Sequence, residues 1–177
     1  MSEHFNPHWE CLLEEASTSP GRSRLFPHWN RQRPMVEPEG WSKQRALAAL
    51  AIREVPFFGD PRSAYGVSGG QEFGINPKAP RPFHTLIHEL GHICLGHTFV
   101  RHDEDITEDI GLKEFGADGV AYIFMHDLGV EEQMDVPHTQ LLMRRRLAGR
   151  TPTENLKHRI YEATETIIEA GRLKAMV

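Results

Sequence analysis

The segment "RPFHTLIHELGHICLGHTF", residues 81–99, holds the tightest cluster of metal-binding side chains in the chain. His88 and His92 are four positions apart, so on an α-helix they lie about 40° apart on one face and can both reach one ion. Pro82 suits the first turn of such a helix, where its missing N–H costs nothing, and Gly96 suits its end. We therefore predict a helix that starts near Pro82 and ends near Gly96.

The other face of this helix is expected to pack. Ile87, Leu90 and Cys94 occupy positions i, i+3 and i+7, which is the spacing of a core-facing stripe. Gly91 leaves room for a close neighbour. The sequence thus predicts a helix with one face for packing and one for chemistry.

Glu89 lies about 100° around the helix from His88, which places it beside the ion and not on it. The pattern H-E-x-x-H on a helix is typical of metal-dependent hydrolases in which the Glu handles the proton of a water molecule. In a chain with 11 histidines, the alternative is an amphipathic helix with incidental surface histidines. Two imidazoles also do not complete a metal site, so a third ligand is required.

His97 is the nearest candidate for that ligand. The extended pattern H-E-x-x-H-x-x-G-x-x-H supplies a third histidine, but it requires Gly at position 95 and His at position 98. This chain has Leu95 and Thr98 there. We therefore interpret His97 as a structural residue or as the partner of a ligand, and keep direct ligation as the alternative.

Glu114 is the stronger candidate. It lies four residues before Asp118 in a predicted apolar helix over residues 107–129, so both carboxylates share one face. Glu114 would complete a His₂Glu site with an open fourth position, and Asp118 would accept a hydrogen bond from a ligating histidine. Two carboxylates that face a core need a cation, although capping or a surface salt bridge is the alternative. The acidic segment 103–109 and His102 are further alternatives. This ligand set favours Zn²⁺, with Mn²⁺ as a second option.

Working outward, we expect helices and short strands in an α+β order. The predicted helices cover residues 7–17, 42–52 with Ser42 as cap, about 132–147, and a last one that starts at the capping box "TPTE" (151–154). The predicted strands lie in residues 53–59, 63–68 and 72–76. Together these elements predict a small, mostly antiparallel sheet packed with the 82–96 helix and several following helices.

Composition is that of an ordinary globular protein. The chain has 177 residues, 39% hydrophobic and 25% charged, and a net charge of −5, so bulk charge does not favour nucleic-acid binding. Two cysteines make no disulfide framework, and no apolar run approaches the roughly 18 residues of a membrane span. We see no signal peptide and expect a cytoplasmic protein without a membrane partner.

We divide the chain into an N-terminal helix and basic, aromatic arm (1–41) and a main domain (42–177). The arm carries residues that could stack on single-stranded DNA. These candidates are Arg22, Arg24, Arg31, Arg33, Trp29 and Trp41. The alternative is an arm that packs its tryptophans on the domain.

The segments "ALAALAIREVPFFG", "AYGVSGGQEFGINPKAPRPFHTLIHELGHICLGHT" and "KEFGADGVAYIFMHDLGV" resemble the zincin-like metallopeptidase domain of ArdC-type plasmid antirestriction proteins. A more distant resemblance is to ImmA/IrrE-type metallopeptidases. The likeness extends over about residues 46–171. It implies a zincin-like fold, a metal held by His88, His92 and Glu114, and Glu89 as the catalytic acid/base. One departure is Gly116, where relatives often carry a second acid.

The stretch "LLEEASTSPGR" is similar to the opening of the single-stranded-DNA-binding domain of those proteins, but the body of that domain is missing here. Three functions follow as expectations. The first is a zinc-dependent peptidase with an antirestriction or mobile-element role that cuts an intracellular protein. The second is a non-enzymatic single-stranded-DNA-binding protein with a structural metal, and the third is a regulatory module for a protein partner.

For the peptidase, we expect "QEFGIN" (71–76) to be the edge strand along which a peptide lies. The candidates for stabilising the oxyanion are Tyr122, His126, His102 and Arg101.

Overall fold

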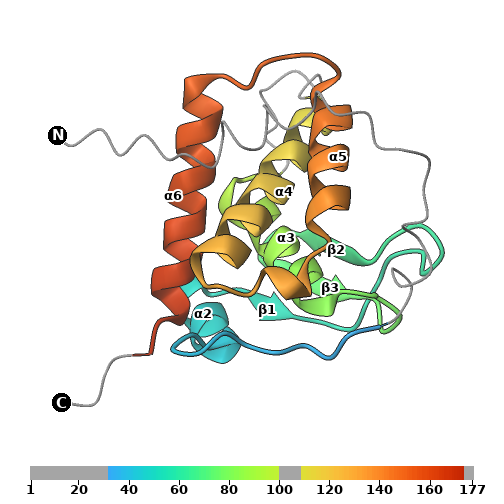
Figure 1. Ribbon diagram of the computed structural model, residues 1–177. Helices are drawn as coiled ribbons and strands as arrows, with labels where there is room; N and C mark the ends of the chain where they lie inside the picture. The colour runs from blue at the N-terminus through green and yellow to red at the C-terminus, as the bar shows by residue number, and fades with distance from the viewer. Residues whose placement is uncertain (1–31, 100–108, 174–177) are drawn as a thin grey trace, which may run out of the picture.

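The computed structural model describes residues 32–99 and 109–173, and within them the fold is α+β, as predicted (Figure 1). The predicted helix over residues 7–17 lies outside these ranges. In the described part of the chain, no helix combines the length and the apolar composition needed to cross a bilayer. The elements in chain order are α2 (Lys43–Leu50), β1 (Arg53–Glu54), β2 (Gly66–Gly69), β3 (Glu72–Ile75), α3 (Pro82–Cys94), α4 (Ile110–Asp127), the 3₁₀ helix η2 (Glu131–Gln133), α5 (Val136–Leu147) and α6 (Glu154–Gly171).

The sheet is mixed, so the prediction of a mostly antiparallel sheet is wrong. Its strand order is β1-β3-β2, with β2 antiparallel and β1 parallel to β3. The reason lies in the connections, since β2 and β3 form a tight hairpin in which Gly70 has φ +57°, whereas a long loop separates β1 from β2. As a result β3 is the central strand. The two edge strands are β1 and β2, and not "QEFGIN" as we expected; β2 is the edge strand that packs on α3.

The core forms where α3 crosses α4. Gly91 of α3 makes this crossing close, because a Cβ there would lie 3.1 Å from the Cβ of Val120 and 3.3 Å from the backbone of Ala117. In Figure 1, α4 lies between α5 and α6. An apolar stripe of α6 is buried at Ile160, Ala163 and Ile167.

Three predicted helix starts are corrected. Ser42 precedes α2, but its side chain makes no capping bond, and its N–H donates to the carbonyl of Gly171. The helix predicted from about residue 132 is η2 followed by α5, because Pro137 is tolerated only in the first turn of a helix. The cap of α6 is Thr153, not Thr151, since the Thr153 hydroxyl accepts from the N–H of Leu156 at 3.2 Å.

Trp41 is part of the core, so it is not a stacking platform for DNA. It is 3% exposed, its indole N–H donates to the carbonyl of Ile167 at 3.1 Å, and its ring lies edge-on to Phe83 and Phe124. The absence of a side chain at Gly171 makes room for this indole. A buried ring of this size stabilises the packing of the arm against α3, α4 and α6.

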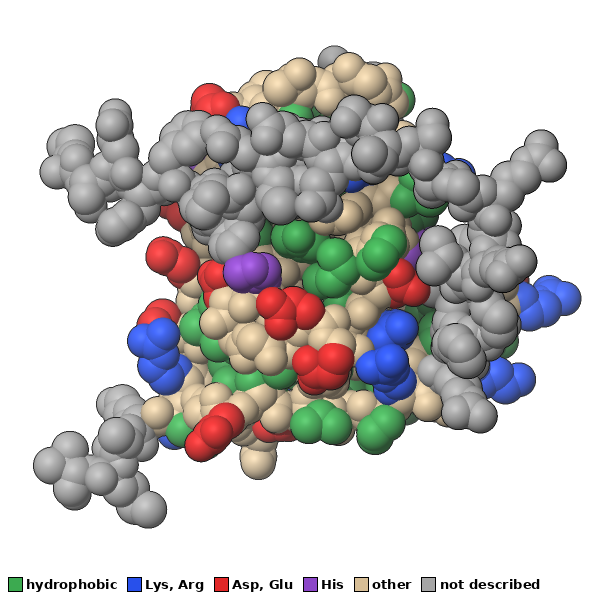
Figure 2. Space-filling view, in the orientation of Figure 1, with side chains coloured by type: hydrophobic (Ala, Val, Ile, Leu, Met, Phe, Trp, Pro, Cys, Tyr) green, Lys and Arg blue, Asp and Glu red, His purple; other side chains and the backbone are tan. Residues whose placement is uncertain are grey.

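The arm is anchored at a second place. The Arg33 N–H donates to the carbonyl of Pro80 at 2.9 Å, and its guanidinium donates to the carbonyl of Glu132. Residues 32–41 are therefore packed on the same body as the rest of the fold. The other nucleic-acid candidates, Arg22, Arg24, Arg31 and Trp29, lie outside the described residues. On the face in Figure 2, acidic and basic side chains are interspersed.

Candidate metal centre

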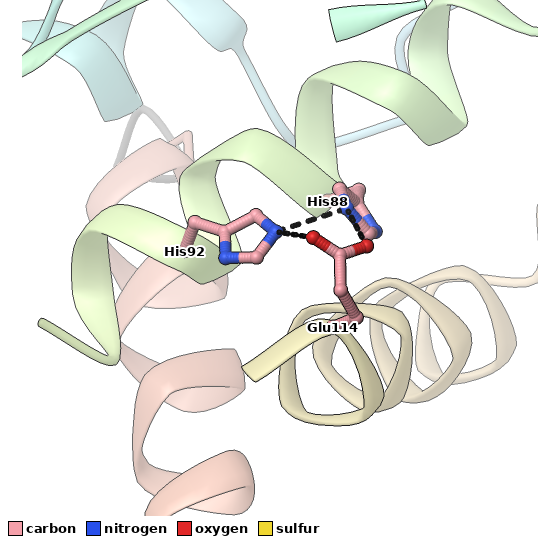
Figure 3. Close-up of side chains that lie close together, drawn as sticks. All are labelled: His88, His92 and Glu114. Atoms are coloured by element: carbon pink, nitrogen blue, oxygen red, sulfur yellow. Dashed lines mark hydrogen bonds and ion pairs between the residues drawn. The ribbon is translucent and has the colours of Figure 1, made fainter. Parts of the chain in front are cut away.

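Three side chains from two helices converge on one point (Figure 3). His88 and His92 come from α3 and Glu114 comes from α4. The Nε2 atoms of the two histidines are 3.1 Å apart. The Nε2 of His92 lies 3.3 Å from the Oε1 of Glu114, and the Nε2 of His88 lies 3.8 Å from its Oε2. All three ligand atoms lie within 4.8 Å of one another, so the group could hold a metal ion.

These spacings fit a tetrahedral ion. Zinc bonds of about 2.0–2.1 Å at tetrahedral angles put two ligand atoms roughly 3.3 Å apart. The separations of 3.1, 3.3 and 3.8 Å lie on both sides of that value. The donor set of two imidazoles and one carboxylate is also one that zinc accepts.

Asp118 determines which nitrogen of His88 carries the proton. Its carboxylate lies 2.9 Å from the Nδ1 of His88, and because an ionised carboxylate can only accept, Nδ1 must donate. The neutral ring then has its lone pair on Nε2, which faces Glu114. Burial lowers the pKa of His88, but the hydrogen bond and charge of Asp118, with Glu89 and Glu114, outweigh burial and leave the pKa raised.

Arg146 of α5 supplies the cation that these carboxylates need. Its guanidinium donates to Asp118 at 2.5 Å and lies 3.0 Å from the Oε2 of Glu114. The run "RRR" (144–146) lies in the last turn of α5, yet Arg146 belongs to the site and is not a solvated helix end. The presence of two inward-facing carboxylates is also not by itself an argument for a metal. The hydrogen bond from His92, helped by the charges of His88 and Arg146 and opposed by burial, lowers the pKa of Glu114 to about 2.

Glu89 lies beside the three ligands and is 5% exposed. Its position depends on Gly66 of β2, because a Cβ there would overlap the Glu89 carboxylate and lie 2.6 Å from the Cγ2 of Thr85. The edge strand therefore passes directly over the acid. This close approach brings together a carboxylate, a candidate metal centre and the edge of β2 that pairs with no other strand among the described residues.

The site opens into a cavity of about 620 Å³. Residues 63–68, which include most of the edge strand, line it together with residues of α3, α4 and α5. Among the lining side chains that were not predicted from the sequence are Tyr65, His84 and His138. His138 is three residues from Asp135, whose carboxylate caps α5, but such a cap gives no sign of a cavity. The burial of His84 lowers its pKa to about 4.

The remaining candidates lie elsewhere. The Nδ1 of His97 is 3.0 Å from the Nδ1 of His92, the nitrogen opposite the one that faces Glu114, so His97 is not in the ligand group. Tyr122 is buried with its hydroxyl near Gln140, and His126 lies at the end of α4. Neither lines the cavity, because they follow Glu114 by about 12 and 18 Å along α4. They are therefore not placed to stabilise an oxyanion at this site. His102 and Arg101 lie outside the described residues.

No family model, no curated protein and no solved structure matches this chain. The resemblance to ArdC-type domains thus stays a prediction. The site itself combines three convergent ligand atoms, a buried acid and a cavity beside the edge of β2, which in the described part of the chain pairs with β3 alone.

Proposed function

We propose that this protein is a zinc-dependent peptidase in which His88, His92 and Glu114 hold the ion and Glu89 is the acid/base. The observation that carries the proposal is that Glu89 is buried against Gly66 of the edge strand and lines the same cavity as the three ligands. A metal that only joined two helices would need neither this acid nor the cavity.

A zinc ion held there would polarise a substrate carbonyl and make a water molecule more acidic. Glu89 would accept the proton of the attacking water as the new C–O bond forms. It would then deliver that proton to the amide nitrogen as the C–N bond breaks, so that a carboxylate and an amine leave. Burial of Glu89 at 5% exposure keeps its carboxylate in one orientation for both transfers.

The edge strand offers a way to hold the substrate. One edge of β2 pairs with β3, and residues Gly66–Ser68 of this strand line the cavity. An extended peptide can add to such an edge through main-chain hydrogen bonds, which place a peptide bond near Glu89 without demanding a particular side chain. Tyr65, which directly precedes this strand, is a large side chain in the cavity lining that would contribute to sequence preference.

The test is the Glu89→Gln variant with denatured casein as substrate. We expect unchanged zinc content and a fall in cleavage of about 10²- to 10⁴-fold, the usual contribution of a general acid/base. Glu165→Gln, an exposed site on α6, is the matched control. Cleavage by Glu89→Gln at the control rate would remove the proposed mechanism.

The biological role that we propose depends on the resemblance alone. It is cleavage of an intracellular protein in an antirestriction or mobile-element setting. Two observations count against the DNA-binding alternative. Trp41, a candidate for stacking on bases, is buried in the core, and the guanidinium of Arg33 is hydrogen-bonded within the fold. No described residue favours the third alternative, a module for a protein partner.

A further inference from the structure

The end of α3 brings His97 back onto His92. Gly96 has φ +78°, the left-handed conformation that ends many helices and that glycine adopts without strain. The N–H of Gly96 donates to the carbonyl of Ile93 at 3.0 Å, and the N–H of His97 donates to the carbonyl of His92 at 2.9 Å. This pair of bonds is a Schellman motif. In this motif the residue after the glycine, here His97, packs against the third residue from the helix end, here His92.

In such motifs the two facing side chains are usually apolar, but here both are imidazoles. Their Nδ1 atoms are 3.0 Å apart and their ring centroids 5.2 Å apart. At this distance one nitrogen donates and the other accepts. When the Nε2 of His92 is a metal ligand it carries no proton, so the ring proton is on Nδ1. His97 must then be the acceptor.

The neighbouring helix leaves room for this ring. Gly116 of α4 lies beside His97, and a Cβ at Gly116 would be 3.3 Å from the Cε1 of His97 and 3.0 Å from the Cδ1 of Leu95. A larger side chain at position 116 would therefore push the ring away from His92. The contact thus depends on two glycines, one that turns the chain and one that makes space.

We infer that His97 is a positioning residue for the metal ligand His92: it accepts the Nδ1–H bond and so presents the Nε2 lone pair to the ion. This inference depends on the metal site of the proposed function and does not depend on peptidase activity. Partners of this kind orient a ligand and raise its basicity, and their loss typically weakens metal binding by about 10- to 100-fold.

The experiment measures the affinity for Zn²⁺ alone, by competition with a chromophoric chelator, in the full-length protein. His97→Phe keeps a ring but has no acceptor, and we expect it to weaken zinc binding by about 10- to 100-fold. His97→Asn puts an amide oxygen at the position of Nδ1, so it should recover most of that loss. Gly116→Ala keeps the histidine at position 97 and only crowds its ring, so it should cause a smaller loss of zinc affinity.

His126→Phe is the matched control, because His126 is also a helix-end histidine but does not line the cavity. Its zinc affinity should equal that of the wild type. Equal affinity in His97→Phe, or no recovery in His97→Asn, would overturn the inference. If the Phe variant does not fold, His97→Leu replaces it in the same comparison. Wild-type protein that binds zinc but cuts no peptide would count against the peptidase only.

Discussion

The two imidazoles of the candidate centre differ in what supports them. His88 donates to a buried carboxylate, Asp118, which is itself paired with Arg146. His92 contacts a neutral partner, His97, which lies five residues further along the same chain segment. One support is charged and joins three helices. The other is uncharged and local, and a single helix end forms it.

The difference has an energetic consequence. A charged partner raises the basicity of the ligand and connects it to the folding of α4 and α5, because removing Asp118 leaves Arg146 with one counter-charge fewer. A neutral partner raises the basicity of the ligand less than a charged one, and it acts mainly on orientation and tautomer. We therefore expect changes on the His88 side to affect both metal binding and stability, and changes on the His92 side to affect mainly metal binding.

The largest effect should come from Glu114→Ala, which removes the only ligand that α4 provides. We expect zinc affinity to fall by more than the roughly 100-fold that a supporting residue contributes. Isothermal titration with zinc measures this. Affinity within tenfold of the wild type would show that the two histidines bind the ion without α4. That result would contradict a site in which α3 and α4 hold the ion together.

Asp118→Asn should come next. Asp118 is 3% exposed, and loss of its charge leaves Arg146 with Glu114 as its counter-charge at the site. We expect the free energy of unfolding in urea to be about 3 kcal/mol lower than in the wild type, both proteins being metal-free. Zinc affinity should also fall by about 10- to 100-fold. His97→Asn is the matched neutral-side variant and should leave the free energy of unfolding nearly unchanged. Equal destabilisation by the two variants would contradict the distinction.

The pH dependence of zinc binding should separate the two sides further. Protons compete with the ion, so affinity falls as the pH drops through the pKa of His88, which lies above its ordinary 6.5. Without the charge of Asp118 that pKa falls, so in Asp118→Asn the loss of affinity should begin at a lower pH. His97→Asn should keep the wild-type midpoint. If the pH midpoint of the affinity loss is higher in Asp118→Asn than in the wild type, Asp118 does not raise the pKa of His88 as proposed.

The same shift affects the stability of the metal-free protein. Because the folded-state pKa of His88 is raised, its protonation stabilises the fold below the unfolded value of about 6.5. This contribution is lost as the pH rises through the folded pKa. The lowered pKa of Glu114, about 2, acts in the opposite direction. Its contribution is present above its ordinary value of 4.5 and is lost as the pH falls toward 2.

The smallest effect should follow from Gly91→Ala. A Cβ there would be 3.1 Å from Val120 and 3.3 Å from Ala117, so α3 and α4 must separate by a few tenths of an ångström. We expect a destabilisation of about 1–3 kcal/mol and a modest loss of zinc affinity through Glu114 and Asp118. The His92–His97 contact, which lies within one segment, should persist in the ring signals of an NMR spectrum. Loss of those signals would show that the local support also needs α4.

The sequence by itself determined the local part of this protein. The i, i+4 spacing of His88 and His92, Pro82 at the start of α3 and Gly96 at its end all act within a few residues, so helical geometry alone predicts their arrangement. The apolar stripe of α6 was predictable for the same reason. The predicted pairing of Glu114 with these histidines rested on the further premise that a carboxylate facing an apolar core requires a cation, and Arg146 already supplies one.

Only the tertiary structure decided the rest. Arg146, 28 residues from Asp118, became the counter-ion of the carboxylates, and Trp41 entered the core against α6, 126 residues away in the chain. The edge position of β2 and the distance of Tyr122 from the cavity were decided in the same way. The physical reason is that spacing along the chain determines which side chains share a helix face. Which elements meet depends on how the whole core packs, and a sequence pattern of a few residues does not contain that information.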